Sequence, residues 1–231
     1  MNKTISSVIF GLALISLVAP RQADATPTLY FSDGTTTFTV GDGSGSDSLA
    51  APGGVTFIGS VGNWVVNVTT GLTKPTLGSS TDPHLNLTSF NQKSSGSSTL
   101  TIKFSETGFN LAPTTWVGTV GGTQGPGGVQ YQTYLDNTNT IFGQGTLLTN
   151  SGCLCVSPFS NTQTSGVAGG SLFSLTQKIT LSSSVGTFKS FNADLAPVPA
   201  PVPEPASLLL LGSGLIGLSG VGFWRRKNTQ A

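Results

Sequence analysis

Charged side chains are scarce in this sequence. Only 8% of its 231 residues are Asp, Glu, Lys or Arg, against about 25% in ordinary domains. From Thr26 to Val202 there are five lysines, seven acidic residues and no arginine, which is a net charge of −2. A nucleic-acid surface needs clustered Lys and Arg to neutralise phosphates, so this composition excludes a nucleic-acid partner.

Histidine is almost absent. His84 is the only one, which excludes a histidine-rich metal site and leaves a Ser-His-Asp triad a single candidate base. No Gly-x-Ser-x-Gly motif is present. Because His84 follows Asp82-Pro83, we expect an exposed polar residue in a turn or at a strand start. The acidic residues are dispersed without the spacing of a glycosidase pair, so we expect no enzyme and no cofactor.

Cysteine occurs only at Cys153 and Cys155. A bond between residues i and i+2 closes a small ring, which the flanking Gly152 could permit. An intermolecular bridge and free thiols are the alternatives. We favour a structural disulfide, local or intermolecular, because two cysteines without other soft ligands do not make a metal site.

One acidic loop suggests calcium. The stretch 42–49 resembles a single nonapeptide calcium repeat, with Asp42 and Asp47 as candidate ligands. A β-roll needs several stacked copies and there is one, so a flexible solvated loop is the favoured interpretation.

Apolar residues alternate with polar ones throughout the middle of the chain. Leu100, Ile102 and Phe104 point one way, and Thr101 and Lys103 the other. No stretch has a 3.6-residue apolar stripe. We therefore predict an all-β body over 26–195, an antiparallel β-sandwich or jelly roll of nine to eleven strands. The same alternation recurs at 64–68, 129–131 and 173–182.

Turn signals and aromatic residues refine this prediction. Asp33-Gly34 predicts a type I′ hairpin between 29–32 and 35–40, and 41–54 and 157–170 are expected to be long mobile loops. Four large aromatic residues could stack on sugar rings, although core packing is their commoner fate. Since Tyr134 is out of phase with Tyr131, we expect at least one of the two to be exposed. The four are Trp64, Trp116, Tyr131 and Tyr134.

The segment 1–25 has the features of a secretory signal peptide. Lys3 precedes an apolar run at 8–18, and Ala23-Asp24-Ala25 gives the small-x-small pattern, with Ala23 and Ala25 at the cleavage site. We therefore expect the Sec translocon and signal peptidase as partners, and Thr26 as the mature N-terminus.

The last 36 residues predict a membrane anchor. The proline-rich segment 196–205 favours an extended polyproline II linker. Residues 206–224 carry no charge and span about 28 Å as a helix, enough to cross a bilayer. The basic stop, Arg225, Arg226 and Lys227, begins a cytoplasmic tail at 225–231. We expect deletion from Asn192 onward to free the body from the membrane.

The order of these parts resembles the PEP-CTERM sorting signal of bacterial exported proteins. The resemblance rests on Val202, Pro203, Glu204 and Pro205, the apolar span and the basic cluster. It implies recognition by an exosortase, a membrane peptidase, near the Pro-Glu-Pro triplet. The body broadly resembles the uncharacterised exported domains that carry this tail, at 56–64 and 141–146, and that likeness implies no activity.

These observations together predict an exported structural or adhesive protein. Its precursor would be anchored in the inner membrane with the body in the periplasm, and the processed protein would reach the cell surface or extracellular matrix, with exopolysaccharide as a possible partner. A carbohydrate- or ice-binding module is the alternative. Outward threonine ladders would favour ice, and exposed coplanar aromatics would favour glycan. A hydrolase built from dispersed acids is the third hypothesis.

Overall fold

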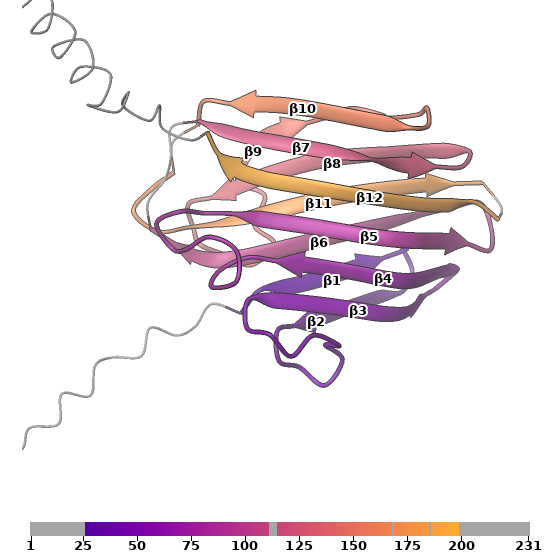
Figure 1. Ribbon diagram of the computed structural model, residues 1–231, viewed down its shortest axis with the longest axis horizontal. Coiled ribbons are helices and arrows are strands. Elements are labelled where there is room, and N and C mark those ends of the chain that lie inside the picture. Colours follow the sequence, from indigo (N-terminus) through magenta and orange to yellow (C-terminus); the bar gives the residue numbers. More distant parts are fainter. Residues whose placement is uncertain (1–25, 111–114, 168, 185, 199–231) are drawn as a thin grey trace, which may run out of the picture.

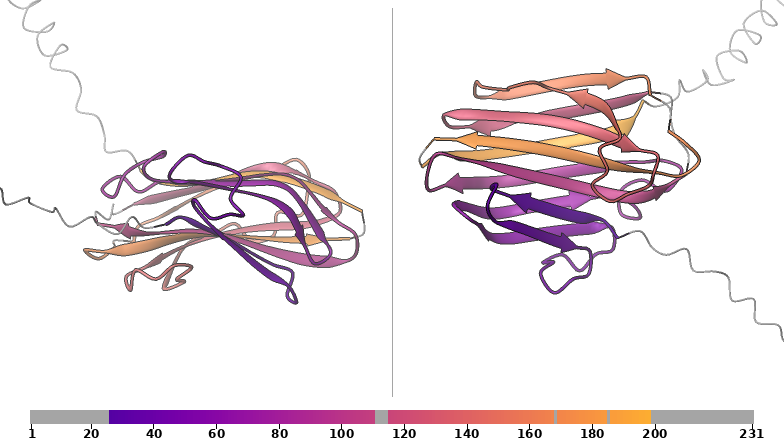
Figure 2. Two further views of the ribbon diagram at one scale, coloured as in Figure 1. Left: turned by 90° about the horizontal axis from the view of Figure 1, so that it is seen from below. Right: turned by 180° about the vertical axis from the view of Figure 1, so that it is seen from behind.

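The body is a sandwich of two antiparallel β-sheets, and each sheet has six strands. The computed structural model describes residues 26–110, 115–167, 169–184 and 186–198. Figure 1 looks onto one sheet with the other behind it, and Figure 2 shows the two layers edge-on. The prediction of an all-β antiparallel sandwich is confirmed.

The first sheet has the order β2-β1-β6-β11-β8-β9, and every neighbouring pair is antiparallel. Its central strands, β6 and β11, are also its longest. The strands are β1 (Thr28–Ser32), β2 (Thr37–Gly41), β6 (Ser98–Phe109), β8 (Gly127–Asp136), β9 (Thr146–Asn150) and β11 (Phe173–Ser183).

The second sheet has the order β10-β7-β12-β5-β4-β3, again antiparallel throughout. Consecutive strands from β5 to β8 alternate between the two sheets, so the chain crosses the sandwich repeatedly. The strands are β3 (Gly54–Val61), β4 (Trp64–Leu72), β5 (Leu85–Ser94), β7 (Trp116–Gln124), β10 (Phe159–Ser165) and β12 (Phe188–Pro197).

The core lies between the sheets, where the alternation of the sequence places it. Leu100, Ile102 and Phe104 of β6 are fully buried, while Lys103 between them is partly exposed on the outward side. A Cβ at Gly71 of β4 would overlap the ring of Phe104. Glycine at this position therefore lets an aromatic ring of one sheet pack against the backbone of the other.

The predicted hairpin forms, but the prediction of a type I′ turn is wrong. Ser32 pairs with Thr37, so four residues connect β1 and β2, and of these only Gly34 has a positive φ, 94°. A type I′ turn needs two such residues. Instead the Asp33 carboxylate accepts the amide hydrogens of Thr35 and Thr36, at 3.0 and 2.7 Å, and the Asp33 amide donates to the Thr36 carbonyl at 3.2 Å.

The prediction of a long loop at 157–170 is also wrong, because β10 lies inside it. This strand forms the edge of the second sheet beside β7 (Figure 1) and contains one buried apolar residue, Phe159, followed by Ser, Asn, Thr and Gln. An edge strand can be polar on both sides, so it shows little alternation. With β10 counted, the described residues form twelve strands rather than nine to eleven.

No helix among the described residues is long and apolar enough to cross a membrane. Both predicted export signals lie outside the described residues: the signal peptide at 1–25 with Ala23 and Ala25, and the tail from 199 onward. That tail includes Val202, Pro203, Glu204, Pro205, the apolar segment 206–224, Arg225, Arg226 and Lys227. β12 runs to Pro197, so the folded body reaches into the expected linker.

Candidate functional site

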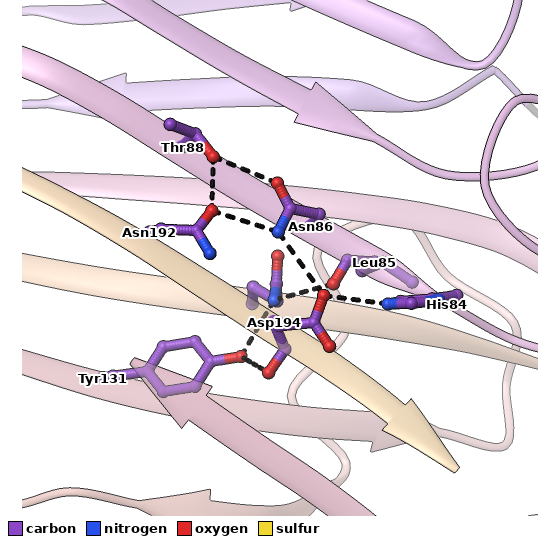
Figure 3. Close-up of polar contacts among 8 residues, drawn as sticks. His84, Leu85, Asn86, Thr88, Tyr131, Asn192 and Asp194 are labelled. Atoms are coloured by element: carbon purple, nitrogen blue, oxygen red, sulfur yellow. Dashed lines mark hydrogen bonds and ion pairs between the residues drawn. The ribbon is translucent and has the colours of Figure 1, made fainter. Parts of the chain in front are cut away.

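A ladder of polar side chains lies on the outward face of the second sheet (Figure 3). It is built by the register of two central strands, which sets Asn86 of β5 opposite Asp194 of β12, and Thr88 opposite Asn192. The residues between them on each strand, such as Leu87 and Ala193, are fully buried. The polar members must therefore face outward, because side chains alternate along a strand.

Hydrogen bonds join the members of this ladder. The side-chain amide of Asn86 donates to Asn192 Oδ1 at 3.1 Å and to Asp194 Oδ2 at 3.4 Å. The Thr88 hydroxyl lies within hydrogen-bond distance of the Oδ1 atoms of both asparagines. These contacts fix the orientation of amide and carboxylate groups that would otherwise rotate freely at the surface.

His84 completes the ladder at the residue preceding β5. Its Nε2 lies 2.8 Å from Asp194 Oδ2, and both side chains are about 30% exposed, at 29% and 30%. The hydrogen bond that His84 makes to the Asp194 carboxylate raises the pKa of His84, outweighing the burial that lowers it, and the negative charges of Asp194 and Asp82 raise it further. We expected His84 to be exposed, but it is half-buried. When it is protonated, it forms an ion pair with Asp194.

The chemistry of this pair is limited by its neighbours. Within the described residues the His84 side chain forms a hydrogen bond only with Asp194, so no hydroxyl or thiol there is bonded to its ring as an activated nucleophile would be. What the arrangement offers is a proton-binding group and a row of ordered amide and hydroxyl groups. Such groups can donate to and accept from the hydroxyls of a polar ligand.

A buried bridge supports the ladder from behind. The Tyr131 hydroxyl of β8 donates to the Asp194 carbonyl at 3.0 Å, and Gln177 Nε2 of β11 donates to that hydroxyl at 2.8 Å and to the Leu85 carbonyl at 3.1 Å. Both donors come from the first sheet, so the bridge ties the two sheets together behind the outward polar row (Figure 3). Burial raises the pKa of Tyr131 well above its ordinary value.

The four aromatic residues considered for sugar stacking are all buried. Trp64 and Trp116 are 0% exposed, Tyr131 2% and Tyr134 9%. The expectation that one tyrosine would be exposed is wrong. Tyr134 does face outward, but the segment after β8 folds back over this end of the sheet, where the Phe142 amide donates to Ser105 Oγ at 3.0 Å.

Cys153 and Cys155 are joined to each other by a disulfide, with their Cα atoms 5.5 Å apart. Leu154 between them pairs with Val129 of β8 through two backbone hydrogen bonds, at 2.8 and 3.1 Å. These two hydrogen bonds hold the short disulfide-bonded segment against the beginning of β8.

Asp42 and Asp47 use their carboxylates to organise the loop between β2 and β3. Asp47 accepts the amides of Leu49 and Thr56 on one oxygen, both at 2.9 Å, and that of Gly43 on the other, at 3.1 Å. Asp42 accepts the Gly53 amide at 2.7 Å. Among the described residues no three His, Cys, Asp or Glu side chains come together as a metal site would need.

A buried ion pair was missed at the sequence level. The Glu106 carboxylate of β6 is fully buried, with Oε1 3.5 Å from Lys74 Nζ. Burial raises the pKa of Glu106 to about 7, although Lys74 and the Thr107 amide lower it. The sequence alternation could have predicted the burial of Glu106, because this residue continues the inward-facing series Leu100, Ile102 and Phe104.

Comparison with known proteins identifies the C-terminal sequence. Residues 201–227 match the family described as the PEP-CTERM protein-sorting motif, which confirms the resemblance noted above. The motif indicates an exported protein, carried by a Sec-type route, anchored transiently at the membrane and processed by an exosortase. The match does not extend into the β-sandwich, and the chain matches no curated protein.

Two solved structures show distant similarity. One is the enzymatically active domain of bacteriophage CBA120 tailspike protein 4, with 13% identity and a TM-score of 0.29, covering 59% of this chain and 19% of that one. The other is infectious bursal disease virus, Gx strain, with 11% identity and a TM-score of 0.27, covering 87% and 55%. This chain spans less than two thirds of either, and neither similarity bears on function.

Proposed function

We propose that this protein is a noncatalytic component of the bacterial surface or extracellular matrix, delivered there by its C-terminal sorting motif. The observation that supports this proposal is the pairing of that motif, at 201–227, with a sandwich whose outward rows carry hydroxyl and amide groups. Its role is structural or adhesive. The route runs through the periplasm, and final delivery follows cleavage near Pro203-Glu204-Pro205.

The position of the last strand suits this route. β12 is a central strand of the second sheet and ends at Pro197, and the Val198 amide donates to the Thr115 carbonyl at 3.1 Å. Only a few residues then separate the folded body from the proposed cleavage region. The sandwich would lie directly outside the membrane, with 206–224 as the transient span and Arg225, Arg226 and Lys227 on the cytoplasmic side.

The outward rows supply groups for an adhesive role. On the second sheet, Thr56 of β3 and Thr70 of β4 share a hydrogen bond of 2.8 Å, and the register continues this row through Thr88 to Asn192. Hydroxyl and amide groups in such rows form hydrogen bonds with polysaccharide hydroxyls at little desolvation cost compared with charges.

Carbohydrate binding is the second candidate, and this row favours it over ice binding. A regular threonine ladder would favour ice. Here the threonines occupy three neighbouring strands, and the row then continues with Asn192 and Gly121. A mixed row of hydroxyl and amide groups is better matched to the irregular hydroxyls of a glycan.

A truncation tests the sorting part of the proposal. A chain ending at Val198 keeps β12 whole, and we expect it to be exported and recovered free of the membrane, whereas the full-length precursor is membrane-associated. Equal membrane attachment of both would reject the sorting route. For the adhesive part, purified exported protein should restore cohesion to the matrix of cells that lack the gene, and no effect on cohesion would reject that role.

A further inference from the structure

Two lysines face each other at the centre of the first sheet. Lys103 of β6 lies directly opposite Lys178 of β11, on the two middle strands. Both side chains are half-buried and point outward, because Ile102 and Ile179 beside them are fully buried. The right-hand view in Figure 2 faces this sheet. Like charges placed directly across a strand pair destabilise it, so this arrangement costs the fold free energy.

Among the described residues, no acidic side chain forms an ion pair with either lysine. The two ion pairs of the described residues are Lys74–Glu106 and His84–Asp194, and neither involves this pair. Burial lowers the pKa of Lys103, and the positive charge of Lys178 lowers it further. The two cations therefore lack a counter-charge in a body whose net charge is negative.

The surroundings of the pair are neutral and polar. One straight row crosses five strands, in the order Tyr30, Lys103, Lys178, Gln132 and Asn150. The strand spacing of about 4.8 Å makes this row about 19 Å long. A parallel row beside it contains Ser32, Thr101, Thr180 and Gln130.

Tyr30 is held in place within the row. Lys103 Nζ lies 5.4 Å from the centre of its ring, and the Phe142 ring packs on it with centroids 5.7 Å apart. At the other end, Gln130 donates to Asn150 Oδ1 at 3.0 Å. The row is therefore partly ordered before any ligand arrives, which reduces the entropy lost on binding.

We propose that this row, named here the lysine row (Tyr30, Lys103, Lys178, Gln132 and Asn150), binds an acidic polysaccharide. Sugar carboxylates would contact the two lysines, and sugar hydroxyls would contact the neighbouring amide and hydroxyl groups. Charge complementarity selects an anion, and the length of the row selects a polymer over a single small ion. The proposal deepens the proposed function by naming a partner class for the exported body.

Other anionic partners fit this face less well. Nucleic-acid binding requires many clustered cations along the phosphate backbone, and two lysines do not meet that need. An anionic membrane surface attracts polybasic segments of several Lys or Arg. An acidic polysaccharide carries spaced carboxylates and many hydroxyls. The carboxylates match Lys103 and Lys178, and the hydroxyls match the neutral hydrogen-bonding groups beside them.

The test uses the mature exported protein, with polygalacturonate as the acidic probe and its fully methyl-esterified form as a neutral probe of the same backbone. We expect binding to polygalacturonate that weakens with salt, and at least tenfold weaker binding to the ester. The double variant Lys103→Gln/Lys178→Gln should lose at least tenfold in affinity. Lys103→Arg/Lys178→Arg keeps both charges and should keep most of the affinity.

Lys93→Gln is the matched control, because it removes one exposed lysine from the second sheet, and its affinity should stay within about twofold. Circular dichroism checks that each variant is folded. The inference is overturned by equal binding of both probes, by an unchanged double variant, by an equal loss in Lys93→Gln, or by preferential binding to inorganic phosphate or phosphatidylglycerol vesicles. Export and processing are measured separately. A protein that is exported and processed but does not bind polygalacturonate would overturn this inference and leave the proposed sorting route standing.

Discussion

His84 Nε2 lies 2.8 Å from Asp194 Oδ2 although the two residues are 110 positions apart in the sequence. The contact links the start of β5 to the neighbouring strand β12. It also places the single histidine of the chain beside the exposed amide ladder, where its charge depends on pH near neutrality.

We predict that the pKa of His84 lies above 6.5 and falls in Asp194→Asn. The hydrogen bond that the His84 ring donates to the Asp194 carboxylate is the largest cause of the raised pKa, and an amide cannot attract the imidazolium in the same way. NMR titration of the only imidazole, in protein without a histidine tag, measures this directly. An equal pKa in the two proteins would show that the pair does not form in solution.

The same pair gives a pH dependence of stability. A raised folded-state pKa means that the stabilisation is fully present below pH 6.5 and is lost as pH rises through the raised value. His84→Gln should show a smaller loss than the wild type over this range, because only the contribution of Glu106 then remains. The free energy of unfolding, measured by urea titration at several pH values, checks the difference.

Glu106 should give a larger pH dependence. The pKa of Glu106 is about 7 in the folded protein against an ordinary value of 4.5, so the folded state binds the extra proton. Stability should fall as pH rises from about 4.5 to above 7, by on the order of 3 kcal/mol. Glu106→Gln keeps the shape of the neutral acid and should flatten this slope in urea titrations. A variant with the wild-type slope would contradict the assignment.

Loss of the disulfide should leave the fold intact. Cys153 and Cys155 close a ring of three residues, and such a short loop contributes less than about 2 kcal/mol. The hydrophobic core does not include either cysteine. Cys153→Ser/Cys155→Ser should therefore keep the wild-type circular dichroism spectrum, with a small decrease in urea midpoint. Global unfolding of the variant would mean that the disulfide has a larger structural role.

Glu204→Ala should block processing of the tail. In the sequence the acidic residue stands between two prolines, a residue type that favours an extended backbone, and we expect the peptidase to contact it there. Unprocessed precursor should accumulate in the membrane fraction on immunoblots. Lys93→Gln, which removes an exposed charge from the body, is the control and should be processed normally. Normal processing of Glu204→Ala would remove its role in recognition.

The sequence predicted the sandwich because the alternation of Leu100, Ile102 and Phe104 depends only on local order. Sequence reasoning did not predict the features that depend on pairing between distant strands or on the contacts of a single side chain. The Asp33 carboxylate set the turn after β1, the polar edge strand β10 had too little alternation to detect, and the register of β5 with β12 brought His84 to Asp194.

The proposed removal of the chain from Asn192 onward was wrong for a similar reason. Ala193 and Leu195 of β12 are fully buried in the core, so this deletion would cut through a central strand of the second sheet and expose its apolar side. The lysine row was equally hidden, since Lys103 and Lys178 are 75 residues apart in the sequence and meet only through the pairing of β6 with β11.

Mass mapping of both termini in each cell fraction tests export and processing in one measurement. We expect a membrane-bound precursor with Thr26 at its N-terminus and an intact tail, and an external form that ends near Pro203-Glu204-Pro205. Recovery of the protein only in the cytosol, with Met1 and Ala231 both retained, would contradict it.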